Sequence, residues 1–67
     1  MAKLTPKIQD RICQAIRAGN YKRTAAQWVG ISEKTLYEWI KKGREAEDPH
    51  NKYAIFAGAL DEAVSAA

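Results

Sequence analysis

A single glycine between two apolar segments constrains this chain more than any other feature. Gly30 follows an apolar segment that ends at Val29, where a helix commonly closes with a positive φ that only glycine adopts without steric cost. Ser32 comes two residues later, and its hydroxyl can accept a hydrogen bond from a free backbone N–H at the start of a new helix. The stretch 22–41 therefore predicts a helix, a sharp turn and a second helix.

The apolar positions around this turn have the spacing of the helix-turn-helix that binds DNA. Ala26 is small enough to let two helices cross closely, and Ile31 can fill the corner between them. The next apolar residues recur at helical spacing and should face the core: Leu36, Trp39 and Ile40. Because the same turn also serves protein contacts, the motif alone does not identify DNA as the ligand.

The sequence before this motif predicts one further helix. Thr5 can cap a helix that begins at Pro6, because the missing N–H of proline costs nothing at the first helical position. Its apolar face consists of isoleucines four residues apart: Ile8, Ile12 and Ile16. Cys13 lies beside this stripe and is expected to be a small buried hydrophobe. Gly19 and Asn20 end the helix, and Asn20 is expected to cap the second helix.

The sequence after the motif predicts a polar connection and a last helix. Gly43 is expected to end or loosen the third helix, and the last helix can start at Asp48-Pro49 or at Asn51. Its expected apolar face is Tyr53, Phe56, Leu60 and Val64. The expected fold is all-α, a three-helix helix-turn-helix domain plus a C-terminal fourth helix. It occupies residues 1–67 as a single domain, with helices over about 6–18, 21–29, 32–42 and 52–66.

Charge is distributed unevenly along the chain, although the formal net charge is only +3. Residues 1–44 carry ten Lys or Arg against three acids, a net charge of +7, whereas residues 45–67 carry five acids against Lys52, a net charge of −4. A basic face of this kind suits a polyanion such as nucleic acid. The alternative is a solvated surface on which the charges segregate without function.

Composition makes several other classes of protein unexpected. A chain of 67 residues allows a small domain but no additional catalytic domain. The sequence has no Ser/His/Asp set, no Cys/His pair, no cluster of metal ligands and no Gly-rich phosphate loop, so we expect no enzyme and no cofactor. One cysteine suits a reducing cytosol. No apolar run approaches the ~18 residues of a membrane span, so no membrane contact is expected.

The candidate DNA-contacting residues fall into two groups. A projection of the third helix at 100° per residue places Lys34 and Lys41 on the side opposite the core and Tyr37 on its flank. With Glu33 they are the expected base readers, because lysine can donate to guanine and glutamate can accept from cytosine. Further expected contacts are Lys42 and Arg44 near the end of this helix, and Lys22, Arg23 and Thr24 as phosphate anchors at the start of the second helix.

Two acids on the third helix oppose this interpretation in part. Glu33 and Glu38 repel phosphate, so one copy of the chain is expected to bind DNA with modest affinity. Glu33 also has a purely structural explanation, since a carboxylate near a helix N-terminus is favoured by the helix dipole.

Two segments resemble a known family. The GIS-x-x-T-x-x-x-W pattern at 30–39 and AGNY at 18–21, together with LTP at 4–6, are similar to the N-terminal DNA-binding domain of small terminase subunits of tailed bacteriophages, a homeodomain-like helix-turn-helix. The resemblance implies recognition of the packaging site on viral DNA in the cytoplasm of the bacterial host. Carried over, Lys34, Tyr37 and Lys41 would lie on the DNA-facing helix.

The same resemblance implies partners besides double-stranded DNA. Family members form homo-oligomeric rings and pass DNA to the terminase large subunit, which holds the ATPase and nuclease. Family members continue into oligomerisation helices beyond this length, so the chain is expected to be an excised DNA-binding domain. The contact with the large subunit is expected in a region of the full-length protein beyond this domain.

Two alternatives remain open from the sequence. The first is a helix-turn-helix regulator of transcription or recombination, which would use the same readout. The second is a protein-interaction module with a structural helix-turn-helix, which would need an apolar outward face on the third helix. Lys34, Glu38 and Lys41 argue against that face.

Overall fold

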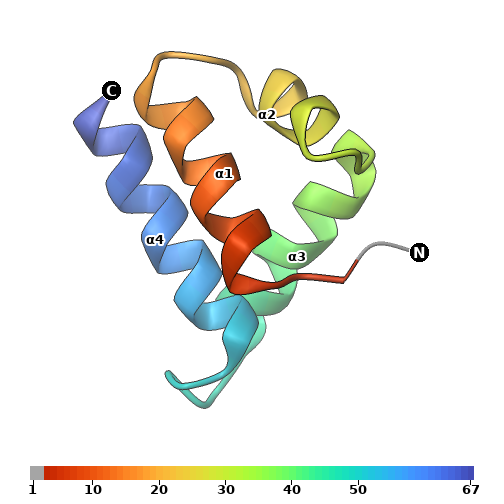
Figure 1. Cartoon of the computed structure of the whole chain (residues 1–67). Helices are drawn as coiled ribbons and strands as arrows, with labels where there is room; N and C mark the ends of the chain where they lie inside the picture. The colour runs from red at the N-terminus through yellow and green to blue at the C-terminus, as the bar shows by residue number, and fades with distance from the viewer. Residues whose placement is uncertain (1–2) are drawn as a thin grey trace.

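The computed structural model describes residues 3–67, which form four α-helices and no strand. The helices are α1 (Pro6–Arg17), α2 (Lys22–Trp28), α3 (Glu33–Glu45) and α4 (Lys52–Ala66). α1 lies between α2 and α4, and α3 extends from the end of α2 to the start of α4 (Figure 1). The expectation of an all-α fold is confirmed, whereas residues 1–2 of the expected domain lie outside the described residues.

Three helices begin with the side-chain caps that their sequences predict. The capping pairs are Thr5 Oγ1 with the N–H of Ile8 at 3.2 Å, Ser32 Oγ with that of Thr35 at 3.1 Å, and Asn51 Oδ1 with that of Tyr53 at 2.8 Å. Each oxygen accepts a hydrogen bond from a backbone N–H that has no partner inside its helix. Of the two possible starts for the last helix, the structure uses Asn51.

The start of α2 differs from the prediction. Its N-cap is Tyr21, which makes no side-chain capping hydrogen bond. Asn20, the expected cap, instead donates from Nδ2 to the backbone carbonyl of Ala15 at 3.0 Å. Gly19 has a φ of +93°, and the chain turns back there so that both the backbone N–H and the side-chain amide of Asn20 donate to the Ala15 carbonyl near the end of α1.

The core lies where the helices meet and is entirely apolar among the described side chains. Its fully buried large residues are Ile12, Leu36, Phe56 and Leu60. Trp39 and Phe56 pack edge to face, with ring centroids 6.0 Å apart and planes at 90°. Cys13 is buried as predicted, and Leu4, from the segment before α1, also joins this core.

The buried face of α4 is rotated from the predicted stripe. Phe56 and Leu60 are buried as expected, but Val64 is 48% exposed and Ala63 is fully buried in its place. Small side chains let α4 approach its neighbours closely, so the contact follows the alanines rather than the largest aliphatic residues. The expectation that Val64 belongs to the core was therefore wrong.

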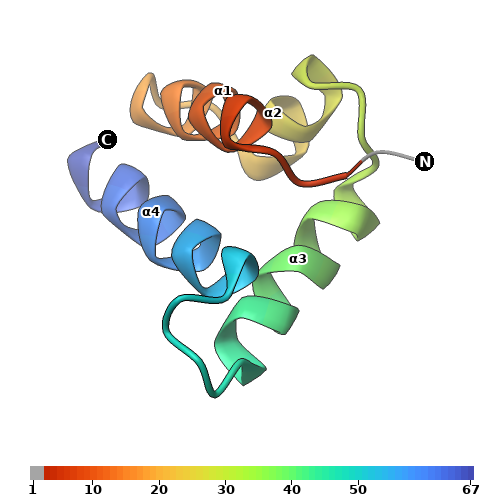
Figure 2. The ribbon, with the colours of Figure 1, turned by 60° about the horizontal axis from the view of Figure 1, so that its bottom comes forward.

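Gly43 does not end α3, which continues to Glu45. A Cβ at Gly43 would overlap the backbone carbonyl oxygen of Tyr53 and would lie 2.8 Å from the Cβ of Ala57. The missing side chain therefore lets α3 and α4 cross at close range. Both views show the later part of α3 beside the first turns of α4 (Figures 1 and 2). The predicted end of the third helix at residue 42 was wrong, because the glycine serves a tertiary contact rather than a helix terminus.

Candidate functional site

The connection between α2 and α3 fixes how these two helices are held together. Gly30 has a φ of +81°, in the region that glycine alone adopts easily. The N–H of Ile31 donates to the carbonyl of Ala26 at 3.0 Å, and the Ile31 side chain is buried. Ala25 and Ala26 are fully buried, so α2 contributes little more than methyl groups to the contact. The short turn and small residues hold the start of α3 close to α2.

α3 has one buried face and one exposed face, as its sequence predicts. The buried residues are Leu36, Trp39, Ile40 and Gly43. Lys34, Glu38 and Lys41 are exposed, and Tyr37 is 49% exposed. Since the core already covers the apolar side, the outer side of α3 presents two lysines, one carboxylate and a tyrosine to a ligand.

A groove lies between α2 and the start of α3. Its lining residues are Tyr21, Lys22, Arg23, Thr24, Glu33 and Tyr37. Five of the nine residues predicted to contact DNA line this groove, although they come from two separate segments of sequence. Two cations, one carboxylate and three hydroxyl groups converge there, which is a set of groups suited to an anionic, hydrogen-bonding ligand.

The predicted cations at the far end of α3 lie elsewhere. Lys42 Nζ lies 5.1 Å from the centroid of the Tyr53 ring on α4. Arg44 Nη2 lies 3.3 Å from Oδ1 of Asp61, also on α4. These two residues therefore face α4 and do not join the groove between α2 and α3.

The two remaining lysines of α3, Lys34 and Lys41, do not line the groove. Lys41 Nζ lies 3.9 Å from Oε1 of Glu45, one turn further along α3, and both side chains are largely exposed. Such a pair contributes little and does not hold the ammonium against another ligand. Within residues 3–67, Lys34 has no ion-pair partner. Lys34 and Lys41 are thus the cations of α3 most accessible to an incoming anion.

Tyr21 is the residue of the groove that the predicted site residues did not include. Its side chain is 83% exposed, the largest exposed fraction among the large hydrophobic residues described. No signal in the sequence indicated this residue, because Asn20 was the expected cap of the second helix and only the structure places Tyr21 at the N-cap. Only the fold shows that this ring lies beside Tyr37 and Glu33.

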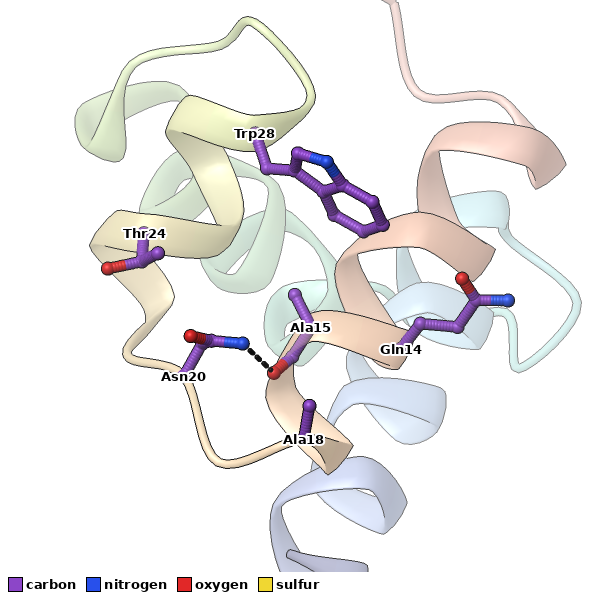
Figure 3. Close-up of a pocket in the computed structure, with 6 residues that line it drawn as sticks. All are labelled: Gln14, Ala15, Ala18, Asn20, Thr24 and Trp28. Atoms are coloured by element: carbon purple, nitrogen blue, oxygen red, sulfur yellow. Dashed lines mark hydrogen bonds between the residues drawn. The ribbon is translucent and has the colours of Figure 1, made fainter.

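A second hollow lies between α1 and α2, and Thr24 lines both hollows. It is lined by Gln14, Ala15, Ala18, Asn20, Thr24 and Trp28. The Trp28 indole extends from α2 toward α1 and remains 55% exposed (Figure 3). None of these six side chains carries a charge, so this hollow lacks the cations that the groove between α2 and α3 provides.

The cysteine and the histidine are far less suited to a functional role. Burial raises the pKa of the Cys13 thiol above its ordinary value, with smaller opposing and reinforcing contributions from nearby charges, and a protonated buried thiol is a poor nucleophile. His50 is exposed in the connection before α4, with Nδ1 3.4 Å from Asp48. No group of three metal-binding side chains gathers within the described part of the chain.

Two further observations bear on the class of protein. None of the helices formed by residues 3–67 has both the length and the apolar character needed to cross a membrane. Comparisons with protein-family models, with curated proteins and with solved structures found no match to this chain.

Proposed function

We propose that this chain binds double-stranded DNA, with α2, the turn at Gly30 and α3 acting as a helix-turn-helix. The observation that carries the proposal is the arrangement of charge on α3 and α2. Lys34 and Lys41 stand exposed on the side of α3 opposite the core, and Lys22 and Arg23 line the adjoining groove. Exposed cations contributed by two neighbouring helices favour binding to a DNA duplex.

In this proposal α3 enters the major groove, which is wide enough for one α-helix. Residues at its N-terminal end would meet base edges, so Glu33, Lys34 and Tyr37 are the proposed readers. Lys22, Arg23 and Thr24 would contact the phosphate backbone beside it. Their contacts would position the domain without reading sequence.

We further propose that the biological role is initiation of viral genome packaging, as part of a small terminase subunit. The resemblance of residues 18–21 and 30–39 to that family supports this role. Homo-oligomerisation and contact with the terminase large subunit would then involve residues beyond this chain. A regulator of transcription or recombination is the alternative, and mapping bound sites on the encoding genome separates the two. Packaging predicts occupancy at the site where genome ends are made, and regulation predicts occupancy at promoters or recombination sites.

The first test is fluorescence anisotropy of labelled duplex DNA at several salt concentrations. DNA binding predicts that log affinity falls linearly with log salt, with a slope of roughly −0.9 for each neutralised phosphate. Lys34→Ala and Lys41→Ala should each weaken binding and leave the melting temperature unchanged. Lys52→Ala is the matched control, because it removes the same charge from α4, a helix that contributes no residue to the groove lining.

The outcomes separate the alternatives. If wild type, Lys34→Ala and Lys41→Ala bind DNA with equal affinity, the DNA-binding surface does not lie on α3. Absence of binding at low salt would leave either a need for several copies or a role in protein contacts. Fusion to an oligomerising scaffold restores DNA binding in the first case and not in the second.

A further inference from the structure

Glu38 places a negative charge on the side of α3 that the proposed function turns toward DNA. It lies in the second turn of the helix, and its side chain is exposed. A rotation of about 100° per residue places it nearly opposite the buried Leu36 and on the same side as Lys34 and Lys41. DNA repels a carboxylate, so Glu38 lowers affinity for every duplex unless it makes a favourable contact with one of them.

The neighbouring lysines do not pair with this carboxylate. Lys42 follows Glu38 by four residues, the spacing and order that favour an ion pair on a helix, but its Nζ lies 5.1 Å from the centroid of the Tyr53 ring. Lys41 lies 3.9 Å from Glu45 instead. Among the described side chains, Glu38 therefore makes no ion pair that would explain its charge.

The helix itself does not require this charge either. Glu33, at the start of α3, is favoured by the helix dipole, whereas Glu38 lies beyond the first turn, where that effect has faded. Alanine would also form the helix at least as well as glutamate does. A charge that stabilises neither the helix nor its packing, and that opposes the proposed ligand, is explained if it recognises a particular base of that ligand.

The chemistry of a carboxylate selects which base this can be. An ionised carboxylate only accepts hydrogen bonds, so it requires a donor on a base edge of the major groove. Cytosine presents its N4 amino group there, whereas guanine and thymine present acceptors. Adenine presents its N6 amino group beside the N7 acceptor, whose lone pair repels a carboxylate. Cytosine is therefore the base that suits Glu38.

The two exposed lysines of α3 suit the other half of the same base pair. Guanine, the partner of cytosine, presents O6 and N7 as acceptors in the major groove, and lysine donates to these atoms. Lys34 lies one turn before Glu38 on the exposed side of the helix, and Lys41 lies about one turn after it. A carboxylate between two ammonium groups thus complements the donors and acceptors of G·C pairs.

We propose that Glu38 is a specificity-determining residue, which accepts a hydrogen bond from the N4 amino group of a cytosine in the major groove. The inference rests on the proposed DNA-binding function and adds a residue to its base readers. Glu38 then has two effects on binding. It lowers affinity for DNA in general, and it raises the preference for cytosine at one position of the bound site.

The test begins with selection of duplexes from a randomised pool, by wild type and by Glu38→Ala. We expect wild type to select a cytosine at one position and Glu38→Ala to lose that preference alone. In anisotropy titrations of the selected duplex, this cytosine is then replaced by pyrimidin-2-one, which lacks the amino group. The replacement should weaken wild type by roughly tenfold and Glu38→Ala by no more than about twofold.

The matched control is Glu45→Ala, which removes the same charge two turns further along the exposed side of α3. Both variants should bind a duplex of unrelated sequence more tightly than wild type does, because each loses a charge that DNA repels. Only Glu38→Ala should lose the preference for cytosine. The effect of a changed net charge is thereby separated from the effect of a lost base contact.

The outcomes distinguish this inference from the function on which it rests. If wild type binds DNA but selects no cytosine, or if loss of the amino group weakens wild type and Glu38→Ala equally, the inference is overturned and the DNA-binding function stands. If wild type binds no DNA in any format, the function fails and the inference fails with it. A lower melting temperature in Glu38→Ala would also overturn the inference, because Glu38 would then have a role in folding.

Discussion

At Gly43 one added methyl group would change the stability of the fold in two ways of opposite sign. In an ordinary helix interior, alanine is more stable than glycine by roughly 0.5–1 kcal/mol. At Gly43, however, the new Cβ would overlap the carbonyl oxygen of Tyr53 and press against the Cβ of Ala57. A backbone carbonyl within α4 cannot rotate aside as a long side chain can. Gly43→Ala therefore forces α3 and α4 apart.

The expected size of this effect follows from the contact. Overpacking a core ordinarily costs about 1–3 kcal/mol, and a clash with backbone belongs at the upper end of that range. After the gain in helix propensity is subtracted, we expect Gly43→Ala to lose about 2 kcal/mol of stability. A domain of this length has roughly 3–10 kcal/mol in total. The melting temperature should fall by about 8–16 °C.

Gly58→Ala is the matched control, because it makes the same chemical change within α4. A Cβ at Gly58 would meet no other atom within 4 Å, so only the gain of roughly 0.5–1 kcal/mol remains. Urea denaturation of wild type and both variants, monitored by the circular dichroism signal of the helices, gives the free energy of unfolding of each. We expect this free energy to fall in Gly43→Ala and to rise in Gly58→Ala. A Gly43→Ala variant as stable as wild type would refute the close crossing of α3 and α4.

Three further predictions follow from other parts of the structure. Trp39→Ala should lose about 3–5 kcal/mol, because the buried indole packs against Phe56, and an unchanged melting temperature would contradict the helical phase of α3. Asp61→Asn should change DNA affinity no more than the matched charge change Glu62→Gln does in anisotropy titrations, because Arg44 and Asp61 form an exposed pair that faces α4, and a larger gain in Asp61→Asn would place Arg44 on the DNA surface. Burial raises the pKa of Cys13, so the unfolded state loses this proton first, and stability should fall as the pH rises past about 9. Urea denaturation at several pH values should show that Cys13→Ala loses less stability above this pH than wild type does. Equal losses of stability would mean that Cys13 does not cause the pH dependence.

The local features of the fold could be predicted because their causes lie within a few residues. Thr5 and Ser32 cap helices through N–H groups three residues away, and the positive φ of Gly30 depends on its own lack of a Cβ. The buried face of α3 follows from helical spacing alone. These features depend on local geometry and are insensitive to what the rest of the chain does.

The features that were mispredicted depend on contacts between distant segments. Glycine is common at helix ends, and only the close approach of α4 shows that Gly43 lies in a helix interior. Asn20 has a capping side chain, but the turn at Gly19 directs it to α1. Val64 is apolar at a plausible spacing, yet Ala63 permits the closer contact. In each case a tertiary contact decided between two roles that the residue could serve.

The candidate site shows the same division between local and tertiary causes. Helical spacing correctly placed Lys34 and Lys41 on the outer side of α3, but it could not show that Glu33 and Tyr37 meet Lys22 and Arg23 across a groove. Tyr21 belongs to the same division, because Asn20 was the expected cap and only the fold places Tyr21 at the N-cap of α2. Where a residue breaks a local rule, as an uncapped tyrosine does at a helix start, stability alone does not account for it, and function is the next explanation to test.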